Sequence, residues 1–521
     1  MKNIALKAIS VAIGSFLSIS VYAQQDMPDT AVFTRIKHEE LSNSHIPEIA
    51  HNLTDAAGSR LTNSPGFKRA GDWAITTMKK WGLTNAAFEP WGEFGKGWEL
   101  EDFSIVVNKP FTKVVIAYPE PWTGNTNGPQ QGEVVLVDQA NMFKASYIDK
   151  HAAEFKGKII LVTGPAVDFN VNFQPAAKRY TAAELDTLQD SYMIPVAMID
   201  RYKAYFKVLQ ESSAALKKTG VLAVISTEGG NNNGVVFVQG YIGYKLNDAI
   251  GVPKVSMGIE DALQIKRMVE GGQHVELSIN IKGRFTTDAP TAYNVVAEIP
   301  GTDPKLKSQL VMLGGHLDAW ASSTGATDNG AGCTVMMEAV RLIQTLKLHP
   351  KRTIRIALWS GEEQGVLGSY NYVKNHFRAA YPGDAKPEQK YVSAYFNLDN
   401  GTGKIRGIYA QGNTAVKPIF EQWLKPFYGM GAQTVTLKNT GSTDHLPFDW
   451  AGIPGFQFIQ DPIDYETRTH HSNMDNYDHL QMDDLKQAAI IVASFVYQTS
   501  VRADMLPRKD MPAEKFVFDG F

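Results

Sequence analysis

Apolar strands and helices alternate along residues 310–398, and this order is the strongest constraint on the fold. Strands are predicted at 310–313, 353–359 and 392–398, with helices at 330–345 and 367–377 between them. Strands joined through helices pair in parallel, because each crossover returns the chain to the same end of the sheet. The sequence therefore predicts an α/β fold with a doubly wound, mostly parallel sheet.

Residues 113–285 follow a different pattern, in which Gly, Asn and Pro separate many short apolar runs. We expect strands at 114–117, 132–138, 157–163, 221–225, 235–238 and 275–281, and a polar helix at 201–218. No titratable cluster in this region suggests chemistry. We interpret it as a β-rich domain inserted between an N-terminal part, residues 24–112, and the α/β part, residues 286–521.

The first 23 residues are typical of a secretory signal peptide. Lys2 and Lys7 precede an apolar run at 8–21, and the small residue Ala23 provides a cleavage site. A membrane anchor is the alternative, but the run is shorter than the roughly 20 residues that a spanning helix needs. We expect an exported protein, periplasmic or secreted, without stable membrane insertion once the signal is removed.

Composition restricts the classes of ligand. The chain has 51 Lys and Arg against 54 Asp and Glu, a net charge of −3, so it lacks the basic field that nucleic acid binding requires. Its one cysteine, Cys333, excludes an internal disulfide and a cysteine-rich zinc site. Any metal ion must therefore be held by histidines and carboxylates.

Polar segments follow the predicted strands of the α/β part, where ligands bind in open sheets of this kind. These segments are GHLD at 315–318, TDNGAG at 327–332, SGEEQG at 360–365, NLD at 397–399 and HSNMD at 471–475. Each is ambiguous alone, since a strand-end histidine is commonly structural and Asp328 could cap the following helix. Together they place three carboxylates and two imidazoles at one edge, where like charges would repel.

A pair of divalent metal ions resolves that conflict. Two ions about 3.5–4 Å apart need a bridging carboxylate, and each needs one further carboxylate and one imidazole. The sequence supplies this set as His316, Asp328, Glu363, Asp399 and His471. Glu362 stands beside a ligand and can act as a base if the backbone bends at Gly361. Asp318 has the chemistry of an acceptor that orients the His316 ring.

These motifs, in this order, resemble those of the co-catalytic two-zinc exopeptidases, a family of aminopeptidases and glutamate carboxypeptidases. GSRLTNSPG at 58–66 resembles the N-terminal signature of the family, and GKIILVT at 157–163 resembles its protease-associated insert. The resemblance covers most of the chain after residue 23 and is greatest to the carboxypeptidase Q branch, whose members cleave unblocked dipeptides. It implies a zinc-exopeptidase domain with a protease-associated domain at 113–285.

The resemblance also implies a role for each residue. Asp328 bridges two Zn²⁺ ions, with Co²⁺ or Mn²⁺ as substitutes. His316 and Asp399 complete one metal site, and Glu363 and His471 the other. His470 is the second choice in the histidine doublet, and Glu362 matches the general base. His445, within TDHLPF at 443–448, matches a substrate-pocket segment, with a structural histidine as the alternative.

The expected function is a secreted di-zinc exopeptidase that hydrolyses short peptides, with unblocked dipeptides as substrates and a homodimer as the implied assembly. An aminopeptidase or an aminoacylase is the alternative on the same fold, and a one-metal cyclase is a further one. A receptor-like binding protein without metal is the non-enzymatic alternative. The intact ligand set and Glu362 favour the enzyme.

Overall fold

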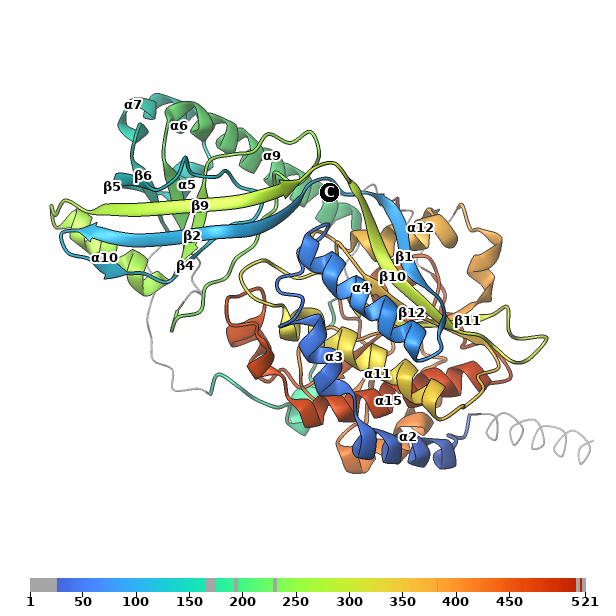
Figure 1. The fold of residues 1–521 in the computed structure, drawn as a ribbon. Coiled ribbons are helices and arrows are strands. Elements are labelled where there is room, and N and C mark those ends of the chain that lie inside the picture. The colour runs from blue at the N-terminus through green and yellow to red at the C-terminus, as the bar shows by residue number, and fades with distance from the viewer. Residues whose placement is uncertain are drawn as a thin grey trace, which may run out of the picture.

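The computed structural model describes residues 26–164, 175–191, 195–227, 232–381, 383–511 and 516–517. The predicted signal peptide, residues 1–23, lies outside the described residues. Two eight-stranded sheets organise the described part of the chain, one in each of two units (Figure 1).

The first sheet carries the predicted α/β pattern at its centre. Its strands, in spatial order, are β1 (Thr84–Glu93), β10 (Thr291–Ile299), β12 (Thr353–Trp359), β11 (Leu310–His316), β14 (Val392–Asn397), β17 (Gly455–Gln460), β15 (Ile405–Tyr409) and β16 (Thr434–Thr436). The four strands β12, β11, β14 and β17 are parallel to one another, whereas β10 runs antiparallel to β1 and to β12, and β15 antiparallel to β17. The α/β prediction is confirmed, but the sheet as a whole is mixed and is mostly parallel only in its middle.

Helices cover both faces of this sheet, as a doubly wound arrangement requires. One face packs against α2 (Thr30–Asn43), α3 (Ile46–Leu53), α4 (Pro65–Lys80), α11 (Ala331–Thr345), α13 (Lys417–Leu424) and α15 (Met482–Val501). The other packs against α12 (Leu367–His376) and α14 (His445–Trp450). Alternate residues of one strand serve the two cores: Leu313 faces the first, and Met312 the second.

Local sequence explains where the helices begin. Ser64 caps α4 by accepting a hydrogen bond from the Phe67 amide, and Pro65 occupies the first turn, where its missing N–H costs nothing. α15 is buried on nearly all sides between the sheet and α2, which explains why its sequence shows little polar face.

The second sheet belongs to residues 97–286, which we call the second-sheet unit. Its strands, in spatial order, are β3 (Lys113–Val114), β2 (Gly97–Lys109), β9 (Glu276–Thr286), β5 (Gln130–Asp138), β6 (Ile159–Thr163), β7 (Ala223–Ser226), β8 (Lys254–Met257) and β4 (Ala117–Pro119). Its helices are α5 (Gln139–Met142), α6 (Ala145–Lys150), α7 (Ala152–Phe155), α9 (Pro195–Thr219) and α10 (Ile259–Glu270). The short helix α8 (Ala182–Asp186) lies in the same stretch of sequence but packs on the first unit, where Leu185 clusters with Ile459. The pairing of β2 with β9 brings residues 97–109 into this unit, ahead of the expected start at residue 113.

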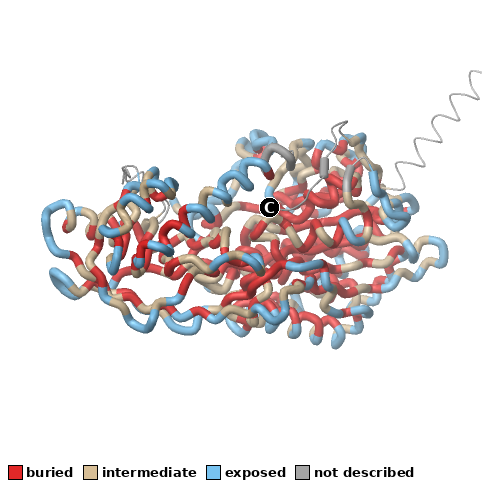
Figure 2. Tube along the Cα trace, turned by 90° about the horizontal axis from the view of Figure 1, so that it is seen from above, coloured by how far each residue is buried: buried red, intermediate tan, exposed pale blue. Residues whose placement is uncertain are grey.

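The long strands β2 and β9 connect the two units (Figure 1), and each unit has its own buried core (Figure 2). The remaining short elements are β13 (Ala380–Tyr381), β18 (Phe516–Val517) and single helical turns at Ala326–Gly330, Pro387–Tyr391, Lys425–Met430, Tyr465–Thr469 and Tyr477–His479. Among the described helices, none is both long and apolar enough to span a bilayer.

One expected strand is wrong. Residues 235–238 are a short apolar run typical of a strand but join neither sheet; their backbone forms a single bridge, from Phe237 to Ser472 in the first unit. A short apolar run shows that a segment is buried but does not identify what buries it, and the partner here is a loop instead of a sheet neighbour.

Arg60 fastens the N-terminal part to the loop that follows β11. Its buried guanidinium donates to the carbonyls of Leu53, Leu317, Thr324 and Gly325, over separations of up to 265 residues. Those carbonyls would lose their donors together if the side chain were replaced.

We therefore predict that Arg60→Met lowers the free energy of unfolding by at least about 2 kcal/mol, because buried acceptors are left unpaired. Arg35→Met is the control, since Arg35 is exposed and makes one hydrogen bond, to Leu346 O. Urea unfolding followed by circular dichroism compares the two variants. Equal midpoints would show that the Arg60 contacts do not hold the loop.

Candidate metal centre

The polar segments lie together at the carboxyl ends of the central parallel strands of the first sheet. His316 is the last residue of β11, Glu362 and Glu363 follow β12, and Asp399 follows β14. The loop after β17 brings in His471. The expected juxtaposition of these strand ends is observed.

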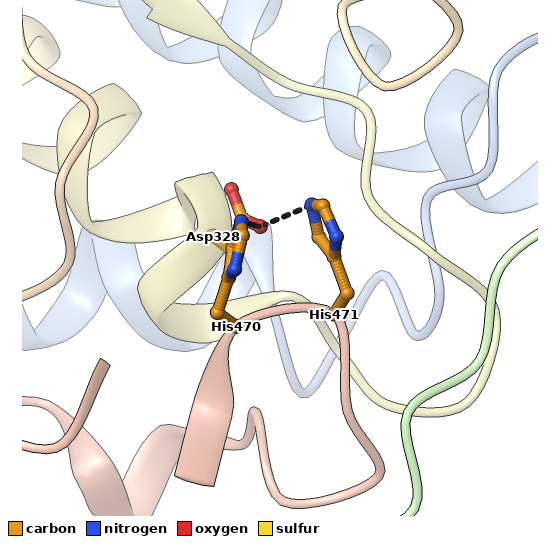
Figure 3. Close-up of side chains that lie close together, drawn as sticks. All are labelled: Asp328, His470 and His471. Carbon is orange, nitrogen blue, oxygen red and sulfur yellow. Dashed lines mark ion pairs between the residues drawn. The ribbon is translucent and has the colours of Figure 1, made fainter. Parts of the chain in front are cut away.

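Asp328 lies at the middle of the group, in the turn Ala326–Gly330 that opens α11. Its Oδ1 is 3.2 Å from Nε2 of His316, and its Oδ2 is 3.2 Å from Nε2 of His471. His470 is also directed towards Asp328 but is more distant, with Nε2 3.9 Å from Oδ2 (Figure 3). One buried carboxylate therefore faces two imidazoles with its two oxygens.

A second carboxylate accompanies each of these histidines. Asp399 Oδ1 is 3.2 Å from Nε2 of His316, and Glu363 Oε2 is 3.0 Å from Nε2 of His471. The side chains thus divide into two groups of one imidazole and two carboxylates that share Asp328. The set His316, Asp328 and Asp399, and the set Asp328, His470 and His471, each bring three potential ligand atoms within reach of one ion.

Asp318 supports the turn that carries the two glutamates. Its carboxylate accepts hydrogen bonds from Thr62 Oγ1 at 2.8 Å, from Glu362 N at 3.3 Å and from Glu363 N at 3.4 Å. Gly361 bends the chain just before them with φ of 69°, in the left-handed region that favours glycine. The His316 ring interacts through Nδ1 with the backbone carbonyl of Asp318 at 2.9 Å, while the Asp318 carboxylate is 3.7 Å away.

Asp475 holds Asp328 in place from behind. It accepts hydrogen bonds from the amides of Thr327, at 2.6 Å, and of Asp328, at 3.1 Å. Asp475 is the last residue of the HSNMD segment, so that one segment supplies both His471 and the support for Asp328.

A cavity of about 510 Å³ opens over this group, and both units line it. The first unit contributes Asp328, Glu362, Glu363, Asp399, Glu466, His470 and His471. The second-sheet unit contributes Tyr202, Phe206, Phe237, Gln239, Tyr241 and Tyr244. The cavity therefore has an acidic floor and a largely aromatic wall.

The chain is similar in sequence to known peptidases. Residues 294–496, which include all the strand-end segments, match the model of peptidase family M28. Residues 294–496 therefore form a domain of the peptidase family M28 type. Carboxypeptidase Q of Bos taurus is 27% identical over 466 residues, 88% of this chain and 85% of that protein. Aminopeptidase YwaD of Bacillus subtilis is 29% identical over 265 residues, 50% of this chain and 54% of that protein.

Solved structures show the same fold. A peptidase M28 precursor from Shewanella amazonensis superposes with a TM-score of 0.66 and 22% identity, covering 93% of this chain and 99% of that one. A zinc aminopeptidase from Bacillus subtilis gives a TM-score of 0.54 and 19% identity, with 89% and 98% covered. The described two-unit architecture is therefore an M28 peptidase fold.

The electrostatics of this group of side chains reflect the crowding of buried acids. Burial, together with the charges of Asp399 and Asp444, holds the pKa of Glu362 well above its usual range. Burial raises the pKa of Glu363 to about 7, against the opposing charge of His471. Burial alone would lower the pKa of His471, but Glu363 and Asp328 raise it to about 10. The site concentrates negative charge that a cation would neutralise.

The donor set fits divalent metal ions. Carboxylate oxygens and imidazole nitrogens are the ligands that zinc takes in hydrolytic sites. Within the described chain, the buried atoms Asp328 Oδ2 and Glu363 Oε1 accept no hydrogen bond, and both residues line the cavity. Buried carboxylate oxygens without donors are costly unless another positive partner satisfies them.

His445 occupies a different place from the other predicted site residues. It is completely buried in α14, its Nε2 lies 3.0 Å from Thr440 O and also contacts the Gln411 amide, and burial lowers its pKa to about 4. Ser442 and Thr443 line the cavity, whereas His445 is absent from the described lining. The structure thus places it behind the cavity wall.

Two residues that sequence reasoning did not single out complete the centre. Asp475 supports Asp328, and its position in the HSNMD segment was the available signal. Gln239, from the second-sheet unit, contacts Nδ1 of His471, and nothing in its own sequence surroundings marks it.

Proposed function

We propose that the chain is a two-zinc exopeptidase that hydrolyses short peptides, with unblocked dipeptides as its preferred substrates. The observation that carries the proposal is the position of Asp328 between His316 and His471, at 3.2 Å from each. The relationship to carboxypeptidase Q and to aminopeptidase YwaD supports exopeptidase activity.

His316, Asp328 and Asp399 would hold one ion, and Asp328, Glu363 and His471 the other. Bound divalent ions polarise a scissile carbonyl and make a water molecule more acidic. Asp318 keeps the glutamate turn in place through its hydrogen bonds to the Glu362 and Glu363 amides. Asp475 keeps Asp328 between the two histidines through its bonds to the Thr327 and Asp328 amides.

Glu362 is the residue that moves the proton in this proposal. It lines the cavity beside Glu363 but is outside both ligand groups, so its carboxylate is available to the substrate side. It takes a proton from the attacking water and gives it to the amine of the leaving residue. Glu466 also lines the cavity and belongs to neither ligand group, so its carboxylate can pair with the ammonium end of a free peptide.

The domain assignment and location follow as part of the proposal. Residues 113–285 would be a protease-associated insert, supported by a separate sheet and core in this region. Export, to the periplasm or outside the cell, is supported by the charged start and apolar run of residues 1–23. The implied homodimer stays a prediction.

The first test concerns metal content. We predict close to two divalent ions per chain and loss of activity on chelation, with recovery on adding zinc or cobalt. Asp328→Asn should weaken both ions at once, because both groups share this carboxylate. Asp288→Asn, at an exposed position, is the matched control. Atomic absorption after dialysis measures the content, and full activity without metal would overturn the mechanism.

The second test separates the adjacent glutamates. Glu362→Gln should keep both ions but reduce kcat at least roughly 100-fold, because the proton acceptor is lost. Glu363→Gln should lose metal as well as activity, because Glu363 Oε2 belongs to the His471 group. Turnover and metal content are measured on the same preparations. Near-normal turnover of Glu362→Gln would refute the role of the base.

The third test concerns the substrate. Free dipeptides should be cleaved with kcat/KM roughly 10–100-fold above that of their amino-acetylated forms, because acetylation removes the charge that Glu466 pairs with. Amidated dipeptides provide the matched comparison at the carboxyl end. Preference for acetylated substrates would favour an aminoacylase or a carboxypeptidase, and efficient cleavage of longer amidated peptides would favour an aminopeptidase.

A further inference from the structure

The second-sheet unit contacts the metal centre through segment 234–239. The Val238 amide donates to His471 O at 2.9 Å. The Val236 amide donates to the Asn473 side chain at 2.7 Å, and the Asn473 amide donates back to Val236 O at 3.1 Å. The Asn473 side chain also donates to Gly234 O at 3.1 Å. These hydrogen bonds join the segment to residues 471–473, which carry one of the two central histidines.

His471 needs such support because its backbone is unusual. Its φ is 56°, in the left-handed region that residues other than glycine rarely adopt. The bond from Val238 fixes the His471 carbonyl, and the Phe237 ring lies 5.5 Å from the imidazole, centroid to centroid. The second-sheet unit therefore holds both the backbone and the ring of this residue.

The side chain of Gln239 contacts the ring nitrogen that faces away from the carboxylates. His471 Nε2 is directed to Asp328 and Glu363, whereas Nδ1 meets the Gln239 amide. A neutral imidazole that binds a metal through Nε2 carries its proton on Nδ1 and donates it. The structure has the Gln239 amide nitrogen, Nε2, at this position. For a metal-bound imidazole the amide is turned by 180°, so that its oxygen accepts the proton of Nδ1; the two amide orientations have the same shape, and the proton position decides between them.

The other central histidine is supported differently. His316 Nδ1 interacts with the backbone carbonyl of Asp318, two residues along the same segment. The two histidines therefore depend on separate supports, one inside the first unit and one from the second-sheet unit. Loss of the Gln239 contact should affect only the group that contains His471.

We propose that Gln239 is a positioning residue that orients His471 across the boundary between the units and sets the metal affinity of the Asp328, Glu363 and His471 group. This rests on the proposed two-metal function. Outer hydrogen bonds of this kind fix the tautomer and direction of a ligating imidazole, and their loss typically costs 10–100-fold in metal affinity. Tight binding of a metal ion by this group then requires that the second-sheet unit is packed against the first unit.

Three variants test the proposal. Gln239→Leu keeps the approximate size of the side chain but removes the acceptor. Gln239→Glu keeps the shape and restores an oxygen acceptor. Gln273→Leu makes the same change at an exposed turn between α10 and β9 and serves as the control. Zinc affinity is measured by competition with a chromophoric chelator, and the visible spectrum of the Co²⁺ form reports the ligand geometry.

We expect the wild-type protein and Gln273→Leu to bind two ions alike, Gln239→Leu to bind one ion roughly 10–100-fold more weakly, and Gln239→Glu to regain affinity to within a few-fold of wild type. The Co²⁺ spectrum should change for one ion only in Gln239→Leu. Thermal unfolding in the presence of chelator should be the same for all variants, which separates positioning from a general folding defect.

Unchanged affinity in Gln239→Leu would overturn the proposal, and so would equal weakening in Gln239→Leu and Gln239→Glu, because the acceptor would then not matter. These outcomes are read relative to the wild-type protein. If the wild-type protein itself fails to bind two ions, the two-metal function fails first, and the two failures are thereby distinguished.

Discussion

The shared carboxylate of Asp328 is the contact on which the candidate centre depends. Its two oxygens each face a different imidazole, so any movement of this residue alters both halves of the site. Such a carboxylate must be fixed from outside, and Asp475 does this by accepting hydrogen bonds from the Thr327 and Asp328 amides. Arg60 fixes the loop just before it, through Thr324 and Gly325. Residues distant in sequence thus converge to place one side chain.

Sequence reasoning found much of this centre because the geometry of a parallel sheet is restrictive. The carboxyl ends of parallel strands lie at the same end of a sheet, so the strand order alone predicts that His316, Glu363 and Asp399 lie close together. The apolar periodicity of a segment predicts that it is a strand but not the direction in which it runs in the sheet. The antiparallel course of β1, β10 and β15 depends on which edge a strand joins, and it was therefore not predicted.

Residues that act across longer distances were harder to place. His445 belongs to a recognisable segment, but a six-residue helix decides which of its neighbours face the cavity, and Thr443 lines it while His445 does not. Gln239 contacts a residue 232 positions away in another unit. Neither relation follows from spacing, because each depends on how two packed surfaces meet.

The position of segment 234–239 links two properties that are commonly treated separately. Phe237 and Gln239 line the cavity in which a substrate would lie, and the same segment holds the His471 loop through backbone hydrogen bonds. A displacement of this segment would alter the cavity wall and, through the backbone of His471, the distances to Asp328 and Glu363. Packed structures transmit such displacements with little loss. The shape of the cavity and the geometry of the Asp328, Glu363 and His471 group therefore depend on the same segment.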